Sequence, residues 1–255
     1  MKIDILTIFP NMFDEILDES IIGRAREAGL ISTVVHDIRQ FSSDKHRRTD
    51  DAPFGGGAGM VMTPQPVFDA IESIDAEKSR LLYMSPRGRL LDADLLTELQ
   101  KEDRITILCG HYEGVDERIL GRFDFEEVSI GDYILTGGEL PAMVLIDALT
   151  RLLPGALGNE ETHDEESIYS GLLEYPQYTR PAVYKDKKAG DMPVPEVLTS
   201  GHHREIHLYQ FRKSLELTAE RRPDLFCAYI ESIPQLDKGE QEILCSVIKI
   251  YDVDK

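Results

Sequence analysis

The chain has 255 residues, of which 42% are hydrophobic and 29% are charged, a composition typical of a globular protein that buries its own core. No apolar run approaches the roughly 20 residues that a membrane-spanning helix needs, so we expect no membrane segment. Three widely spaced cysteines, Cys109, Cys227 and Cys245, favour a reducing, cytoplasmic location. The net charge of −19 taken alone argues against nucleic-acid binding, but basic residues cluster locally, so charge does not decide the question.

Apolar runs alternate with helical patterns over the first 153 residues, which predicts an α/β fold with a largely parallel sheet. The long segment 39–60, between the strand expected at 31–38 and the helix expected at 64–74, is polar and then glycine-rich, which is typical of a functional loop. Strands are expected at 2–8, 31–38, 80–84, 105–109 and 126–130, and helices from 11 or 14 to 28, at 64–74, 92–100 and 139–153.

The character of the sequence changes after Pro154-Gly155. Residues 159–167 are acidic and have no periodicity, so they predict a linker. Helices are expected at 204–218, 223–230 and 238–251. We therefore predict an α/β domain over residues 1–158, a linker over 159–175 and a small helical domain over 176–255.

Three glycine-containing loops follow three of the expected strands. They are Ser85–Gly88, Cys109–Arg118 and Ser129–Pro141, and the last runs directly into the apolar helix pattern 139–153. Glycine lets the backbone approach a ligand closely. Because loops at the carboxyl ends of parallel strands converge on one crevice, the three loops predict one pocket lined by main-chain groups.

The segment Phe54–Met60 is also rich in glycine, but it lacks the lysine and the Ser/Thr of a phosphate-binding Walker loop. A loop without a ligand and a loop that contacts phosphate or ribose both fit it. The basic run Lys45–Arg48 just upstream adds weight to contact with a nucleic-acid backbone.

No arrangement for covalent catalysis stands out in the sequence. The histidines His202, His203 and His207 do not have the spacing of a zinc protease, so exposed or RNA-contacting roles are favoured over metal ligation. A carboxylate base and an arginine remain, namely Glu166 in the acidic linker and Arg151 at the end of the apolar helix. By residue type alone, the acidic linker is equally typical of a solvated surface.

Taken together, the motifs resemble those of the bacterial tRNA (guanine-N1)-methyltransferases of TrmD type, in the SPOUT superfamily. The resemblance covers nearly the whole chain, and the combination is highly specific. The motifs occur in the order Asp51 with Phe54–Met60, Leu108–Arg118, Ser129–Pro141, Arg151–Gly155, Tyr178–Pro181 and Ser200–His203.

The resemblance implies an enzyme that transfers a methyl group from S-adenosylmethionine to N1 of the guanosine 3′ of the tRNA anticodon, position 37. It implies a parallel sheet with a deep trefoil knot, in which the cofactor lies bent, and a small helical C-terminal domain that binds tRNA. It also implies a homodimer, in which the helical domain and linker of one subunit complete the site of the other. Magnesium is implied only as an ion bound together with substrate, and no dedicated metal site is expected.

Residue roles follow from the same resemblance. Catalysis is expected from Glu166 as general base and Arg151 as the group that stabilises O6. Cofactor binding is expected from Met84, Pro86, Gly110, Tyr112, Glu113, Ser129, Ile130, Gly131, Asp132, Tyr133, Ile134, Leu135, Gly137, Gly138 and Pro141. Contact with tRNA is expected from His46, Arg48, Asp51, Gly55, Gly56, Gly57, Gly59, Thr179, Arg180, Ser200 and His203.

Three positions depart from the family's pattern. Glu166 stands where the family has aspartate, Gln177 where it commonly has histidine, and Phe54 where it often has tyrosine. The extra methylene of Glu166 displaces the carboxylate, and Asp164 is the alternative base. Three other functions remain open, and two of them are a SPOUT methyltransferase acting on another RNA and an RNA-binding paralogue with weak or lost activity. Phosphate binding by the loop at 55–59 is a third.

Overall fold

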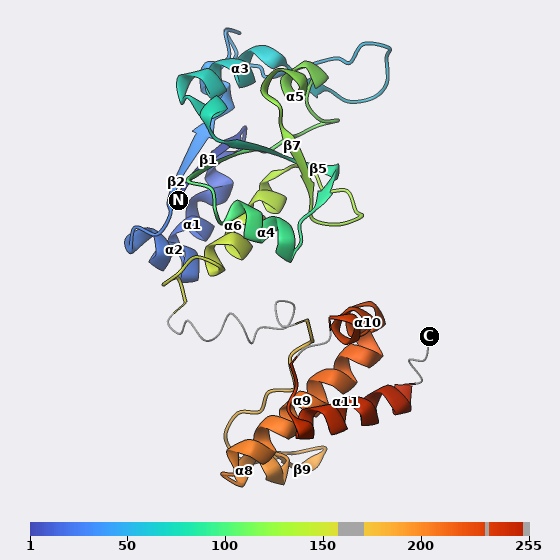
Figure 1. Ribbon diagram of the computed structural model, residues 1–255. Coiled ribbons are helices and arrows are strands. Elements are labelled where there is room, and N and C mark those ends of the chain that lie inside the picture. Colours follow the sequence, from blue (N-terminus) through green and yellow to red (C-terminus); the bar gives the residue numbers. More distant parts are fainter. Residues whose placement is uncertain (158–170, 233–234, 252–255) are drawn as a thin grey trace. The chain divides into compact units, whose positions relative to one another are not determined.

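The computed structural model describes residues 1–157, 171–232 and 235–251. The chain divides into two compact units, Met1–Glu160 and Glu161–Lys255, which are coloured along the sequence in Figure 1. Among the described helices, none is both long enough and apolar enough to cross a membrane.

The first unit is built on a sheet of five parallel strands in the order β2-β1-β6-β5-β7. This confirms the α/β prediction and the largely parallel sheet. The fourth strand along this order, β5, runs six residues beyond its predicted end at residue 84. The strands are β1 (Lys2–Thr7), β2 (Ser32–Asp37), β5 (Arg80–Leu90), β6 (Arg104–Leu108) and β7 (Glu126–Ser129).

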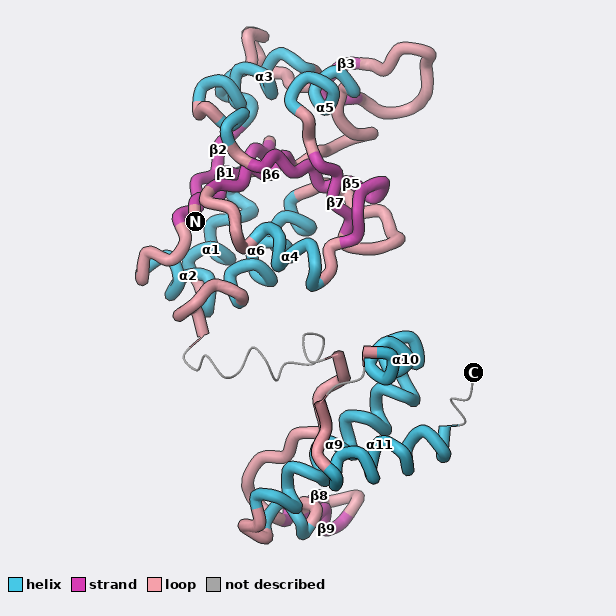
Figure 2. Tube along the Cα trace, viewed as in Figure 1, coloured by secondary structure: helices cyan, strands magenta, loops and turns pink. Residues whose placement is uncertain are grey.

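Helices cover both faces of this sheet (Figures 1 and 2). Along β1, Ile3 and Ile5 belong to the core under one set of helices, and Leu6 belongs to the core on the other face. This alternation is the two-residue period of a strand. One face carries α1 (Asp14–Asp18), α2 (Ser20–Glu27), α4 (Ala93–Leu99) and α6 (Glu139–Arg151), and the other carries α3 (Pro64–Ser73) and α5 (Glu117–Phe123).

Short elements complete the unit. Strands β3 and β4 pair antiparallel and close the long loop that was expected at 39–60. These elements are β3 (Asp50–Asp51), β4 (Val61–Met62) and the 3-10 helices η1 (Pro10–Phe13), η2 (Ile38–Phe41) and η3 (Ala76–Lys78).

The single helix predicted up to residue 28 is wrong, because the structure divides it into η1, α1 and α2. Glu19 is extended, with φ −105° and ψ 161°, and Ser20 has a positive φ of 54°. These two residues interrupt the helical backbone. The apolar positions on both sides still face the same core, so the hydrophobic period continues across the break and conceals it.

The second unit has its own core, in which Leu215, Phe226 and Val247 are fully buried. Its three longer helices match the predicted ones. An antiparallel hairpin was not predicted. The elements are β8 (Val183–Asp186), β9 (Gly190–Pro193), α8 (Glu196–Thr199), α9 (His203–Arg221), α10 (Pro223–Glu231) and α11 (Lys238–Tyr251).

A buried carboxylate ties three elements of the first unit together. Asp4 on β1 is completely buried, and its oxygens lie 2.8 Å from Nε2 of His36, 2.8 Å from Nε of Arg104 and 3.1 Å from Nζ of Lys2. Arg104 also donates to the carbonyl of Ile74 at the end of α3, at 2.7 Å. Burial raises the pKa of Asp4, but the hydrogen bonds from His36, Lys2 and Arg104 outweigh this effect and lower it to about 2.

We expect Asp4→Asn to reduce the free energy of unfolding by about 2 kcal/mol at neutral pH, because Lys2, His36 and Arg104 lose a charged, buried acceptor. The folded pKa lies below the value of 3.8 for an unperturbed carboxyl. The stabilisation is therefore full above about pH 4 and is lost as the pH falls toward 2. Urea denaturation at several pH values measures this, with Asp94→Asn on the exposed side of α4 as control. Equal stability of the Asp4 variant and wild type at neutral pH would contradict it.

Candidate active site

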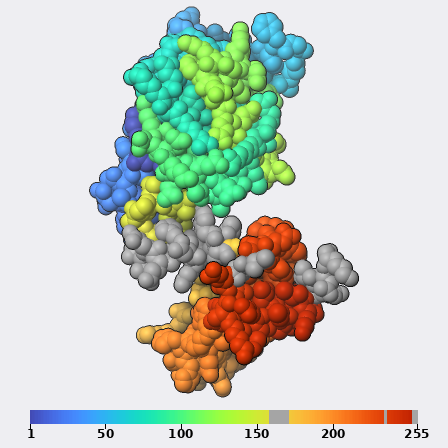
Figure 3. All heavy atoms as spheres, viewed as in Figure 1, coloured from blue at the N-terminus to red at the C-terminus, as the bar shows by residue number. Residues whose placement is uncertain are grey.

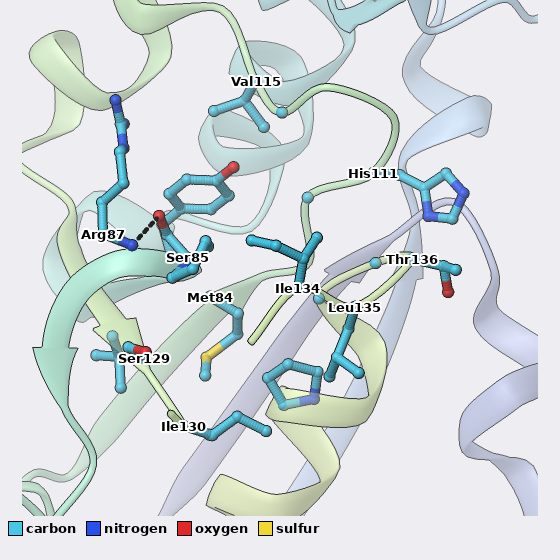
Figure 4. A pocket seen from close by; sticks show the side chains of 18 of the residues that line it. Met84, Ser85, Arg87, His111, Val115, Ser129, Ile130, Ile134, Leu135 and Thr136 are labelled. Atoms are coloured by element: carbon cyan, nitrogen blue, oxygen red, sulfur yellow. Dashed lines mark hydrogen bonds between the residues drawn. The ribbon is translucent and has the colours of Figure 1, made fainter. Parts of the chain in front are cut away.

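A pocket of about 510 Å³ lies where β5, β6 and β7 end (Figure 4). The three glycine-containing loops predicted to meet do meet here, and they form its walls. In Figure 4 the side chains of Met84, Ile134 and Leu135 lie in the middle of the pocket, with Arg87 and His111 on opposite sides. The lining is therefore made of main chain and apolar side chains, with charged groups at the margin.

The walls are held together where the segment after β7 lies against the loop after β6. The backbone N–H of Gly138 donates to the carbonyl of Gly110 at 2.8 Å, and His111 forms an isolated antiparallel bridge with Gly137. A Cβ on Gly138 would lie 2.8 Å from Cα of Cys109, closer than real Cβ contacts. Glycine is thus required for this close approach of two backbones.

Strand β5 lies between the two segments that meet in this way. After Met84 it bulges and returns to the same partner, since Met84 and Arg89 both pair with Val128 of β7. The N–H of Leu91 then donates to the carbonyl of Ser129 at 2.8 Å. The chain leaving β7 must therefore cross the end of β5 to reach the loop after β6.

A carboxylate is buried behind this crossing. Glu139 is the first residue of α6 and is 2% exposed. Its Oε1 accepts a hydrogen bond from Oγ1 of Thr7 on β1 at 2.8 Å, and its Oε2 lies 3.9 Å from Nδ1 of His111. The N-terminus of a helix favours a negative charge. Glu139 thus connects β1, α6 and the loop after β6 at the back of the pocket.

The glycine-rich loop 52–59 is joined to the same pocket. The N–H of Glu113 donates to the carbonyl of Met60, and the N–H of Met62 donates to the carbonyl of Gly114, both at 3.0 Å. The loop itself projects from the first unit as a blue lobe in Figure 3, and Phe54 in it is fully exposed. All four glycines at 55–57 and 59 have positive φ, which explains the composition of this loop.

All the predicted cofactor-binding residues except Asp132 line the pocket. The prediction missed lining residues that neighbour the quoted glycines or end the strands. Four of them, Arg87, His111, Val115 and Thr136, directly neighbour a glycine of these loops and could have been found by that signal. The missed residues are Tyr83, Ser85, Arg87, His111, Gly114, Val115, Glu117, Val128 and Thr136.

Two ionisable groups at the pocket, the thiol of Cys109 and the phenol of Tyr83, are held in their neutral forms by burial. Cys109 is completely buried, and burial followed by the charge of Glu139 raises the pKa of its thiol well above the usual value. Burial also raises the pKa of Tyr83. The guanidinium of Arg87 is held by two hydrogen bonds of 3.2 Å to the carboxylate of Glu127. The site is therefore suited to binding and orienting a molecule rather than to covalent catalysis.

Of the two predicted catalytic residues, only Arg151 is among the described residues. Arg151 is the last residue of α6, ten positions after Pro141, which lines the pocket. Glu166 and its alternative Asp164 lie outside the described residues. Across the described ranges, no three His, Cys, Asp or Glu side chains are grouped to hold a metal ion.

The residues predicted to contact tRNA are all at the surface of their units. His46, Arg48, Asp51 and the four glycines of 55–59 are exposed in the first unit, and Thr179, Arg180, Ser200 and His203 in the second. Arg48 is held by Asp44, whose carboxylate lies 3.3 Å from Nη2 of the arginine. Two basic residues of α9 are also paired: Lys213 lies 2.7 Å from Glu216, and Arg204 pairs with Asp237.

A parallel α/β sheet with a main-chain-lined pocket at its carboxyl edge defines a class of proteins that hold a small molecule between loops. Comparison with known proteins gives the particular family. The family model described as tRNA (Guanine-1)-methyltransferase TrmD matches residues 1–228. The chain belongs to this family.

Individual relatives agree with the family assignment. A tRNA (guanine-N(1)-)-methyltransferase of Ruminiclostridium cellulolyticum is 52% identical over 229 residues, 89% of this chain and 96% of the relative. One from Limosilactobacillus fermentum is 52% identical over 231 residues, 88% and 89% of the two chains. One from Alkaliphilus metalliredigens is 46% identical over 254 residues, 98% and 99% of the two chains.

Membership of a methyltransferase family implies S-adenosylmethionine as methyl donor, and this ligand can test the role of Glu139. We expect Thr7→Val to weaken its binding roughly 10-fold, because Glu139 behind the crossing loses the hydrogen bond from the Thr7 hydroxyl. We expect a similar loss for Glu139→Gln, because the N-terminus of α6 loses its buried negative charge. Thr7→Ser keeps the hydroxyl and should bind within about 2-fold of wild type. Isothermal titration calorimetry gives the affinities, and unchanged binding by both Thr7→Val and Glu139→Gln would contradict the prediction.

Proposed function

We propose that this chain transfers the methyl group of S-adenosylmethionine to N1 of the guanosine immediately 3′ of the anticodon, position 37 of tRNA. The observation that carries the proposal is the pocket at the ends of β5, β6 and β7, because its loops are the segments whose motifs resemble the family's. The match over residues 1–228 includes every one of these loops. We further propose that the enzyme is cytoplasmic, as its tRNA substrate requires.

The residues around the pocket fit this cofactor. A nucleoside with an amino-acid tail offers several donors and acceptors, which main-chain groups of the lining loops can match. The apolar side chains of Met84 and Leu135 suit the adenine ring. When bound, the cofactor supplies a methyl group on a positively charged sulfur, which is already electrophilic. The protein has to hold this methyl group in line with N1 of the base.

The crossing of β5 supports the proposal that the first unit contains the deep trefoil knot of this superfamily. The segment 130–138 passes from the edge strand β7 over the end of β5 to Gly110. The bulged part of β5 returns to β7 beside it. A chain end threaded through such a loop is an exception among protein folds. In this proposal the knot is what brings three loops around one ligand.

For the chemistry we propose that Glu166 removes the proton from N1 of guanine, with Asp164 as the alternative base. N1 is a poor nucleophile until this proton leaves, and a carboxylate within hydrogen-bonding distance accepts it. Negative charge then develops on O6. The guanidinium of Arg151 is proposed to stabilise this charge. A magnesium ion, if bound with the substrate, would be held jointly by protein and RNA.

We propose that the active site is completed by a second copy of the chain. Arg151 follows Pro141 by ten helical residues, so it lies about 15 Å further along the axis of α6 than the pocket wall. In this proposal the partner's Arg151, and not the Arg151 of the same subunit, reaches the pocket. An apolar surface around α6 supports pairing: Leu140 and Val144 on α6 are 49% and 48% exposed, and Met12 on the adjoining η1 is 45% exposed.

The tRNA is proposed to contact the glycine-rich loop with His46, Arg48 and Asp51, and the second unit through Thr179, Arg180, Ser200 and His203. Their exposure supports this, as does the attachment of the glycine-rich loop to the cofactor pocket at Met60 and Met62. A base that enters between that loop and the pocket would reach the methyl group.

Methyl transfer to a tRNA transcript with guanosine at position 37 tests the function directly. We expect incorporation of one methyl group per tRNA with wild-type protein, and none with a transcript that carries adenosine at this position. Mass mapping of the product identifies the modified nucleotide. Methylation elsewhere in tRNA or only in ribosomal RNA would favour a different methyltransferase. Binding without transfer would indicate a non-catalytic paralogue.

The identity of the base is tested by Glu166→Ala and Asp164→Ala in single-turnover assays, which separate chemistry from product release. Glu166→Ala and Arg151→Ala should each lower the rate by roughly 10²-fold or more, since each removes a group that acts in the transition state. Asp164→Ala should stay near the wild-type rate. A large loss with Asp164→Ala alone would assign the base to Asp164 instead.

The subunit arrangement is tested with Val144→Lys, which places a charge in the exposed apolar surface of α6. We expect this variant to be monomeric by light scattering and to lose methyl transfer, because a lone subunit lacks the partner's Arg151. Val34→Lys is the control, since Val34 is 38% exposed on the strand β2, on the sheet face opposite α6. A monomeric wild type with full activity would exclude the composite site.

A further inference from the structure

The antiparallel hairpin β8–β9 is the part of the second unit that the predicted function leaves unused. Its turn is fixed locally, because Oδ1 of Asp186 accepts hydrogen bonds from the N–H groups of Lys188 and Ala189, both at 2.7 Å. The N–H of Val194 donates to the carbonyl of Ala182 at 2.8 Å and extends the pairing past the strand ends. Figure 2 shows the two strands outside the helices that form the core of the unit.

Neither face of the hairpin is covered within the described part of the second unit. Tyr184 and Met192 pair across the strands and are 59% and 52% exposed, and Val183 is 40% exposed. A two-stranded hairpin with no covering element is only marginally stable in water. A partner on this surface would stabilise the hairpin.

Three lysines follow one another along the hairpin and its turn: Lys185, Lys187 and Lys188. Among the described residues, no carboxylate lies within 4.0 Å of any of the three ammonium groups. Asp191 stands opposite Lys185 in the register but forms no such pair, and Asp186 is engaged in its own turn. The three charges are therefore available to an external ligand.

Several other cations of the same unit are paired with carboxylates. Arg212 and Lys213 both pair with Glu216, at 4.0 and 2.7 Å, and Arg222 pairs with Asp224 at 2.6 Å. A polyanion must displace these carboxylates before its phosphates can form ion pairs with the arginines or the lysine. In a chain with a net charge of −19, cations without such partners are the favourable contacts.

We propose that the β8–β9 hairpin is a docking surface for the phosphate backbone of the RNA substrate, with Lys185, Lys187 and Lys188 as the groups that contact phosphate. The inference rests on the proposed tRNA methyltransferase function. In the sequence the hairpin lies between two pairs of expected tRNA contacts, Thr179 with Arg180 and Ser200 with His203. Lysine contacts of this kind position the RNA and do not read its sequence.

The test is the full-length triple variant Lys185→Gln, Lys187→Gln, Lys188→Gln, with tRNA binding measured by fluorescence anisotropy between 50 and 200 mM KCl. We expect the dissociation constant to rise about 10-fold or more. The slope of log Kd against log salt should fall by about 2 to 3, because roughly 0.7 to 0.9 counterions are released per phosphate contact. Affinity for S-adenosylmethionine, measured on the same variant, should not change.

The matched control removes the same charge from paired cations: Arg212→Gln, Lys213→Gln, Arg222→Gln. It should change the tRNA dissociation constant less than about 3-fold and the slope by less than about 1. Equal losses in the two triple variants would reveal a general charge effect and overturn the proposal. Wild-type tRNA affinity and slope in the hairpin variant would also overturn it, and would favour an acidic protein as partner. Absence of tRNA binding by wild type would refute the proposed function itself.

Discussion

The pocket depends on one contact, the hydrogen bond from the N–H of Gly138 to the carbonyl of Gly110. Strand β5 separates β6 from β7 in the sheet, so ordinary neighbouring loops would leave these two segments apart. The crossing over β5 brings them together and makes both of them walls of one cavity. It also fixes where α6 begins. The direction of that helix then decides how far Arg151 lies from the pocket.

The two backbones approach closely at the crossing because Gly110 and Gly138 have no side chains. The carboxylate of Glu139, which is buried behind the crossing, supports it. Glu139 would be costly to bury alone, but it accepts a hydrogen bond from Thr7 and lies at the positive end of α6. Glu139 also lies next to His111, which lines the pocket, so the residue that supports the crossing is adjacent to the pocket wall. The same carboxylate adds to the burial that keeps the thiol of Cys109 neutral, so the back of the pocket is structural and unreactive.

Elements with a strong hydrophobic period could be predicted from the sequence, and so could the meeting of three loops. Apolar runs such as Ile105–Leu108 define buried strands regardless of their surroundings, and parallel strands bring their carboxyl ends to one edge. The break at Glu19 and Ser20 could not be predicted, because it leaves the apolar face of the helices continuous. The β8–β9 hairpin was missed because its residues are exposed on both faces, which removes the alternation that identifies strands. The roles of Glu166 and Arg151 came from resemblance alone.

The acidity of the chain is compatible with RNA binding because only some of its cations are paired with carboxylates. Net charge sets the long-range repulsion, which salt screens within about 10 Å, whereas contact energies depend on individual ammonium and guanidinium groups. Carboxylates neutralise Arg204 and Arg222 locally, so these residues add little to an RNA surface. Lysines held away from carboxylates by a hairpin turn keep their full charge. An acidic enzyme can therefore bind a polyanion through a few exposed lysines, and its overall charge would then weaken binding elsewhere on the surface.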